Sequence, residues 1–327
     1  LSIMKSSQEI QRRLFQQLKN NSVSKRGIAH IVLFCVGAIY AVNYIVAKGI
    51  MPDFIGPSGF IFYRVFLATV IFWIIHRFTS KEKIDRDDVP KFIQAAIFGV
   101  ALNQLMFFNG LNLTTPLNAS FIMTSNPILV LIASAFILKE RITPTRLTGI
   151  MLGLGGALLI ILLPFLLGVS DVEWMAGDPL GDGMILINSM SYGIYLVTVK
   201  PLLMKYEPLT AIKWIFTFGC VLVFPFGYDQ ALAVDWSSFT PEIWWGFAFV
   251  IIFVSVLVYF FNVYAMKSVS PSVVSAYIYL QPVLAGGLSL ALGMEELHWL
   301  KVVAALMIFG GVYLVAIRKK PTESEVG

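Results

Sequence analysis

The sequence predicts an all-α integral membrane protein with ten transmembrane helices, arranged as two inverted repeats of five helices. Three observations support this: the composition, a series of long apolar segments and an internal repeat. Of the 327 residues, 57% are hydrophobic and 13% are charged, and the mean hydropathy is +0.79. A soluble domain is about one quarter charged. The composition therefore favours a chain that lies mostly within a membrane.

Apolar segments of about 20 residues follow one another along the chain, and each is long enough to cross a bilayer as a helix. Helices are favoured because backbone polar groups in hydrocarbon must be bonded internally. Strands of a barrel would alternate with a period of two, which these segments do not. In order, the predicted spans are 28–50, 57–78, 90–112, 115–138, 145–167, 180–204, 208–228, 241–266, 270–293 and 298–317.

The connections between these segments alternate in charge. Most of the 24 Lys and Arg residues lie before residue 28, within 77–91, within 139–146, at Lys205 and Lys267, and in 318–320. The other connections carry Asp53, Asp171, Glu173, Asp178, Asp229, Asp235 and Glu242. Basic residues of short loops stay in the cytoplasm. We therefore expect a multi-pass protein of the cell (inner) membrane with both termini cytoplasmic. The net charge of +5 is interpreted as a signal of this topology, and we expect no nucleic-acid partner.

Two short tails flank the predicted helical region, at residues 1–27 and 319–327. The first has no apolar core of a cleavable signal peptide. Its apolar and basic residues fit either an amphipathic helix on the inner leaflet or a solvated tail. Cys35 and Cys220 fall inside predicted spans, where nothing supports a disulfide or a metal site. We expect no metal and no cofactor.

An internal repeat relates the two halves of the chain. TTPLNASFIMTSNPI, residues 114–128, aligns without a gap with VSPSVVSAYIYLQPV, residues 269–283. The matched pairs are Pro116 and Pro271, Ser120 and Ser275, Asn126 and Gln281, Pro127 and Pro282, Tyr40 and Tyr192, and Lys48 and Lys200. The repeats are residues 28–167 and 180–318, each with five predicted spans.

An odd number of spans in each repeat means that the second repeat enters the membrane from the opposite side. Such inverted repeats are typical of transporters in which a central site opens alternately to either face. Pro127 and Pro282 fall at matched positions and each removes a helical hydrogen bond. We interpret both as hinges beside the site; the alternative is a tolerated kink.

The fold and motifs together resemble the EamA group of the drug/metabolite transporter superfamily. The resemblance rests on the five-plus-five repeat, on KER at 139–141 and MEE at 294–296, and on the glycine pairs at 155–156 and 310–311. It covers about residues 28 to 318. It implies a basket of ten helices, with a cavity lined by the first, third, fourth, sixth, eighth and ninth, and exporters of amino acids and other metabolites are typical members. The first helix reads AIYAVNYIVAKG at 38–49 and lacks the frequent Trp-Gly motif, which leaves the substrate open.

Polar residues on the cavity helices are the candidate substrate-binding residues, because lipid cannot satisfy them. Each can instead form a structural bond between helices. The candidates are Tyr40, Asn43, Tyr44, Lys48, Arg64, Asn103, Asn126, Tyr192, Tyr195, Lys200, Tyr259, Asn262, Tyr277, Tyr279 and Gln281.

The charges within the spans are basic, at Lys48, Arg64, Lys200 and Lys213, and no Asp or Glu lies deep in any span. An anionic or zwitterionic substrate is therefore favoured, with a carboxylate or phosphate meeting Lys or Arg. The alternative for Lys48 and Lys200 is that their long side chains extend to the membrane surface.

We therefore predict a secondary transporter, an exporter of small polar metabolites such as amino acids, that works by alternating access. A passive channel is an alternative, since pores also have polar linings. An intramembrane enzyme is less favoured, because all three histidines lie at segment ends and no HExxH or GxSxG motif occurs in the spans. The expected partners are a small-molecule substrate and the lipid bilayer.

Overall fold

The structure is a computed structural model that describes residues 25–43, 46–47, 49–114, 119, 122–166, 168, 178–291 and 299–317. Several sequence predictions lie outside these residues. They are the predictions for Tyr44 and Lys48, for most of the N-terminal tail and all of the C-terminal tail, and for the MEE motif at 294–296.

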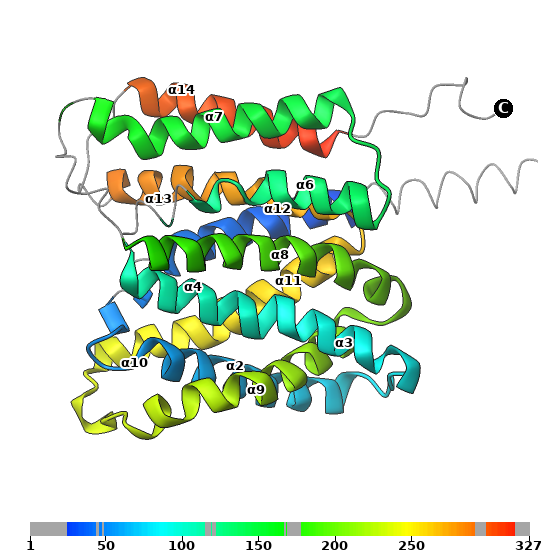
Figure 1. The fold of residues 1–327 in the computed structure, drawn as a ribbon, viewed down its shortest axis with the longest axis vertical. Coiled ribbons are helices and arrows are strands. Elements are labelled where there is room, and N and C mark those ends of the chain that lie inside the picture. Colours follow the sequence, from blue (N-terminus) through cyan, green and yellow to red (C-terminus); the bar gives the residue numbers. More distant parts are fainter. Residues whose placement is uncertain are drawn as a thin grey trace, which may run out of the picture.

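The described residues form a bundle of helices that run roughly parallel or antiparallel to one another, without a strand (Figure 1). The first helix is Lys25–Asn43. The others are α2 Pro57–Thr79, α3 Val89–Ala96, α4 Leu102–Leu113, α6 Asn126–Ile137, α7 Pro144–Leu166, α8 Pro179–Lys205, α9 Pro208–Leu232, α10 Pro241–Phe249, α11 Val258–Met266, α12 Pro271–Ala276, α13 Leu280–Ala291 and α14 Trp299–Ala316.

In the part of the chain that the structure describes, six helical stretches are long and apolar enough to cross a membrane: Lys25–Asn43, Pro57–Thr79, Arg86–Leu113, Pro208–Leu232, Pro241–Met266 and Trp299–Ala316. Large apolar side chains cover their outer faces, and Phe78, Val221 and Leu306 are 84, 69 and 68% exposed. An apolar exterior of this extent is suited to lipid rather than water. The chain is a multi-span, all-helical membrane protein.

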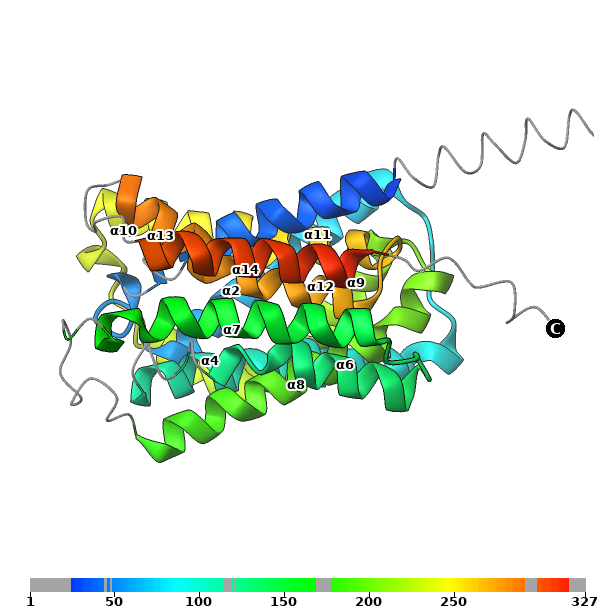
Figure 2. The same ribbon diagram turned by 90° about the horizontal axis from the view of Figure 1, so that it is seen from above.

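The two described ends of the chain lie at the same end of the bundle (Figure 2). We call this the basic end; it also carries the connections 80–88, 138–143, 206–207 and 267–270. The opposite, acidic end carries the connections 51–56 and 233–240. The basic end is named for the Lys and Arg residues that cluster there in the sequence, and the acidic end for Asp53 and Asp235 in its two connections.

Helices α7 and α14 pack side by side through glycines, on the outer side of the bundle (Figure 1). A Cβ atom added at Gly149 would lie 2.7 Å from the Gly311 carbonyl oxygen, and one at Gly311 would lie 2.6 Å from the Gly149 carbonyl oxygen. Small residues allow helix backbones to approach closely where the hydrophobic effect does not drive association. The glycines therefore fix the position of this helix pair.

Replacing Gly311 by Ala is expected to lower the melting temperature of the detergent-purified protein. The added methyl group meets backbone atoms of α7, which cannot rotate away, and overpacking of this kind typically costs about 1–3 kcal/mol. The matched control is Gly183→Ala in α8, where an added Cβ has nothing within 4 Å. An equal effect of the two substitutions on melting temperature would contradict this account.

Four stretches within the bundle depart from α-helical geometry. The fourth predicted span is interrupted by a turn at Thr124 and Ser125, directly before Asn126 and Pro127. The ninth contains a 3₁₀ turn, Tyr277–Tyr279, which separates α12 from α13. Two π-helical stretches, Ile97–Ala101 and Val250–Leu257, lie within the third and eighth spans. Such irregular turns occur frequently at functional sites.

Candidate functional site

A polar cavity lies in the middle of the bundle, with a volume of about 100 Å³. This accommodates several water molecules, because one water needs about 10–15 Å³ on this measure. The walls come from the first helix, α2, α4, α6, α8, α11, α13, the π-helical stretch η5 (Val250–Leu257) and the 3₁₀ turn η6 (Tyr277–Tyr279). The cavity is therefore large enough for a small organic solute.

Most of the polar residues predicted from the sequence meet at this cavity. Those in its wall are Tyr40, Asn43, Arg64, Asn103, Asn126, Tyr192, Tyr195, Tyr259, Asn262 and Gln281. The wall also contains residues that the sequence analysis did not select: Gln104, Phe107, Phe108, Met123, Asn188, Val254 and Ile278. Gln104 and Asn188 could have been selected from the sequence, because each carries a polar amide within an otherwise apolar span.

Arg64 is the cation of the cavity wall, and its side chain is almost fully buried, at 3% exposed. Its Nε donates to Ser255 Oγ over 3.1 Å, and its guanidinium carbon lies 4.7 Å from the centre of the Phe108 ring. Its Nη1 has no hydrogen-bond partner among the described residues. The wall, as far as it is described, contains no carboxylate that would balance this charge.

The π-helical stretch η5 positions the partner of Arg64. Ser255 Oγ donates to the Val250 carbonyl over 3.1 Å, one residue further than an α-helical turn reaches. The hydroxyl is thereby oriented to accept from Arg64 Nε. The local widening of the helix thus holds one side of the guanidinium and leaves the other side toward the cavity.

A chain of hydrogen bonds fixes the amide of Gln104. The Tyr259 hydroxyl donates to the Gly99 carbonyl over 3.2 Å and therefore accepts from Gln104 Nε2, at 2.8 Å. This bond uses one of the two N–H groups of the amide and does not involve Gln104 Oε1. This oxygen is buried and has no partner among the described residues.

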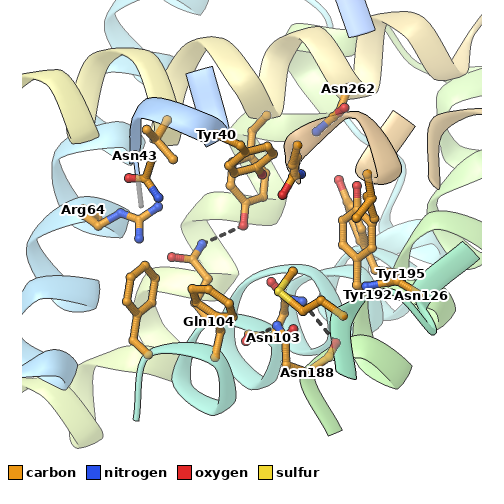
Figure 3. Close-up of a pocket in the computed structure, with 17 residues that line it drawn as sticks. Tyr40, Asn43, Arg64, Asn103, Gln104, Asn126, Asn188, Tyr192, Tyr195 and Asn262 are labelled. Carbon is orange, nitrogen blue, oxygen red and sulfur yellow. Dashed lines mark hydrogen bonds between the residues drawn. The ribbon is translucent and has the colours of Figure 1, made fainter. Parts of the chain in front are cut away.

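Three further buried polar atoms of the wall have no described partner: Asn43 Oδ1, Asn126 Oδ1 and the Tyr195 hydroxyl. Arg64 and Asn43 lie at one end of the cavity, whereas Asn126, Tyr192 and Tyr195 lie at the other (Figure 3). An unpaired buried polar group costs about 1–3 kcal/mol. Their gathering around one cavity makes this cavity the candidate substrate site.

Asn103 and Asn188 have a structural role as well as a place in the wall. Asn188 Nδ2 donates to the Asn103 carbonyl over 2.8 Å, and Asn103 Nδ2 donates to the Asn188 carbonyl over 3.3 Å. These two bonds join α4 to α8 across the floor of the cavity (Figure 3). Their amides are thus already bonded, unlike the oxygens of Asn43 and Asn126.

Three predicted residues do not lie in the wall of this cavity. Lys200 donates to the carbonyl oxygens of Met266 and Val269, the latter at 2.9 Å, at the basic end. The Tyr277 hydroxyl is bonded to His30 Nδ1 over 2.8 Å. The Tyr279 ring packs against Gly153 of α7.

The fourth basic residue within the predicted spans, Lys213, is also remote from the cavity. Its Nζ lies 4.3 Å from the centre of the Trp73 ring and 3.2 Å from His76 Nδ1, between α2 and α9. It is almost fully buried, at 3% exposed. Arg64 is therefore the one predicted cation that the described structure brings to the cavity.

Aromatic rings occupy the space between the cavity and the acidic end. Phe60, which contacts the Arg64 guanidinium, lies 6.1 Å from the Phe247 ring, and Phe247 lies 5.9 Å from Trp236. Trp236 in turn contacts Phe239 of the 233–240 connection, at 5.1 Å between ring centres. This chain of rings separates the site from the acidic end.

An apolar helical bundle around a buried polar cavity is the arrangement expected of a membrane transport protein. The model of the EamA-like transporter family matches residues 27–162 and 179–317, which is most of the chain. The chain belongs to this family, as its sequence motifs predicted. Family membership also confirms the prediction that the protein is not an enzyme.

Several relatives match this chain over most of their own length. YetK of Bacillus subtilis, named an uncharacterized transporter, is 25% identical and aligns over 98% of this chain and 97% of its own. YyaM, of the same organism and similarly named, is 26% identical over 79% of this chain and 84% of its own. A solved crystal structure, 16% identical, superimposes with a TM-score of 0.67 over 89% of this chain and 97% of that chain, which shows a shared fold.

Proposed function

We propose that this protein is a secondary transporter that moves a small zwitterionic or anionic metabolite across the membrane by alternating access. The observation that supports this best is that five buried polar atoms without described partners belong to residues in the wall of one cavity: Asn43 Oδ1, Arg64 Nη1, Gln104 Oε1, Asn126 Oδ1 and the Tyr195 hydroxyl. A bound solute would supply the missing partners for part of the transport cycle. The site would then be stabilised by the substrate and not by protein groups alone.

The chemistry of the unpartnered atoms defines the substrate. Arg64 Nη1 is a cationic donor, which requires an anionic acceptor such as a carboxylate. The oxygens of Asn43, Gln104 and Asn126 are acceptors, which require N–H or O–H donors. A single molecule with both an anionic group and several donors, such as an amino acid, satisfies both requirements. A simple organic cation satisfies only the second and meets repulsion from Arg64.

Several matched features support the inverted repeat on which alternating access depends. The π-helical stretches begin at Ile97 and Val250, a separation close to that of the sequence repeat. Helices α2 and α9 pack side by side, as do α7 and α14, which are the second and fifth spans of the two halves. The family model also matches each half separately. We therefore propose ten spans in two repeats, at 28–167 and 180–318.

The substrate class is tested by ligand-induced stabilisation of the purified protein, because a ligand that binds the folded state raises its melting temperature. Three matched sets are compared: zwitterionic amino acids, the corresponding carboxylic acids without the amine, and the corresponding amines without the carboxylate. We expect stabilisation to decrease in that order, with none from the amines. Stabilisation by amines but not by carboxylates would contradict the proposal.

The proposed topology, with both termini in the cytoplasm, predicts which surface residues react from outside the cell. In a variant with Cys35 and Cys220 replaced by Ala, a cysteine introduced at Ser237 is expected to react with an impermeant maleimide in intact cells. A cysteine at Ser80 is expected to react only after permeabilisation, because it lies at the opposite end of the bundle. The reverse pattern would show that the orientation is inverted.

A further inference from the structure

A second hollow lies at the basic end of the bundle, apart from the central cavity, with a volume of about 770 Å³. We call it the basic vestibule. Its wall joins the start of the first helix, the connection before α7, α8, the 267–270 turn and the end of α14. The charged residues of its described wall are Arg26, Glu140, Arg141, Arg146, Lys200 and Lys267.

Positive charge exceeds negative charge in this wall. Glu140 is the carboxylate of the described wall, and its Oε2 is paired with Arg146 Nη1 at 3.0 Å. Arg26 and Lys267 have no carboxylate partner in the described structure. Lys200 is bonded to backbone carbonyls and not to a carboxylate. The vestibule therefore holds cations that an added anion would balance.

A residue of this wall also carries a polar atom without a described partner. The hydroxyl oxygen of Ser270, in the wall between α11 and α12, is buried and makes no hydrogen bond among the described residues. A hydroxyl next to several cations is suited to donate to an oxyanion. The missing partner and the unbalanced charge thus point to the same kind of ligand.

Apolar side chains continue the wall toward the outside of the bundle. Met204 and Ile317 line the vestibule and are 70 and 40% exposed. These side chains belong to the outer surface, which we have assigned to lipid. Basic pockets between helices at a membrane surface are suited to the head groups of anionic lipids.

We propose that the basic vestibule binds a phosphate oxyanion, most directly that of an anionic phospholipid head group whose acyl chains lie along the apolar rim. Inorganic phosphate from solution has the same chemistry and is the other source of such an anion. Because Lys200 holds the turn that leads into α12, an anion beside it would stabilise this end of the bundle. This site is distinct from the proposed substrate site.

The test uses the full chain in neutral detergent and two double variants that each remove two positive charges at the same end. Arg26→Gln with Lys267→Gln alters the vestibule, whereas Lys81→Gln with Lys83→Gln alters exposed residues of the 80–88 connection. Melting temperature is measured with added phosphatidylglycerol, with phosphatidylcholine, and with inorganic phosphate at constant ionic strength. Native mass spectrometry counts the lipids retained.

We expect phosphatidylglycerol, but not phosphatidylcholine, to raise the melting temperature of the wild type and of the control. In the vestibule variant the apparent affinity for phosphatidylglycerol is expected to fall about 25-fold, since two cations are removed and each contributes about fivefold near an anionic lipid. If inorganic phosphate, but not phosphatidylglycerol, binds the wild type more tightly than the vestibule variant, the bound oxyanion comes from solution. The vestibule is then still an oxyanion site. Equal responses of the two double variants, or no response to either anion, would overturn the proposal.

Discussion

Replacing Arg64 by Gln is expected to weaken substrate binding by about 30- to 1000-fold, while the protein remains folded. The range corresponds to roughly 2–4 kcal/mol, the typical loss when one partner of a buried charge pair is removed. The fold should survive because the one hydrogen bond between this guanidinium and the described protein groups joins Nε to the neutral hydroxyl of Ser255. Arg64→Lys should recover only part of the affinity, because an ammonium lacks the planar two-point contact with a carboxylate.

The control for this experiment is Lys213→Gln, which removes another buried cation from a site between α2 and α9. Because Lys213 does not line the cavity, this change is expected to lower stability and to leave affinity close to that of the wild type. Affinity and melting temperature are measured on the same preparations. If Arg64→Gln binds substrate as tightly as the wild type, Arg64 is a structural residue and the substrate assignment is wrong.

Replacing Pro127 and Pro282 by Ala is expected to slow transport more than it affects binding. Each proline lies at the start of a helical stretch that follows an irregular turn beside the cavity. Alanine restores an N–H donor and favours a continuous helix, so the balance between the two open states should shift. A shift of about 1–2 kcal/mol in this balance would change the transport rate roughly 5- to 30-fold.

Pro208→Ala is the matched control for the hinge variants. Pro208 also begins a helix, α9, but it lies outside the described wall of the cavity. Initial rates of uptake into liposomes and substrate affinity are compared for all three variants. Wild-type rates in both Pro127→Ala and Pro282→Ala would remove the reason for regarding these prolines as hinges.

The long apolar helices could be predicted closely from the sequence, because membrane spans are set by length and hydropathy. The segments predicted at 57–78 and 180–204 correspond to α2 Pro57–Thr79 and α8 Pro179–Lys205. The interruption before Pro127 was also predictable, because proline constrains the preceding backbone locally. These features depend on residues close together in the sequence.

The π-helical stretches were not predictable from composition. Ile97–Ala101 and Val250–Leu257 are apolar throughout or nearly so, and the same residues fit an ordinary α-helix. What distinguishes them is bonding to side chains of other helices: the Gly99 carbonyl accepts from Tyr259, and Ser255, which also bonds to Val250 within its own stretch, accepts from Arg64. Contacts of this kind depend on neighbouring helices.

The orientation of the ninth helix explains why two predicted tyrosines fall outside the cavity wall. Over Tyr277–Tyr279 the chain forms a 3₁₀ turn, in which residues three apart lie on the same face. Ile278 and Gln281 share the face toward the cavity, and Tyr277 and Tyr279 are turned to either side. Polarity alone, which both tyrosines share with Gln281, does not reveal this change of helical period.

Counterflow in proteoliposomes tests the central claim most directly. Vesicles containing the purified protein are preloaded with the solute that most stabilises it, and uptake of the same labelled solute from outside is followed. A carrier with alternating access is expected to show saturable uptake that is accelerated by the internal solute and lost in Arg64→Gln. Uptake that is neither saturable nor changed by preloading, or that is accompanied by steady electrical conductance, would instead show a passive pore and contradict this account.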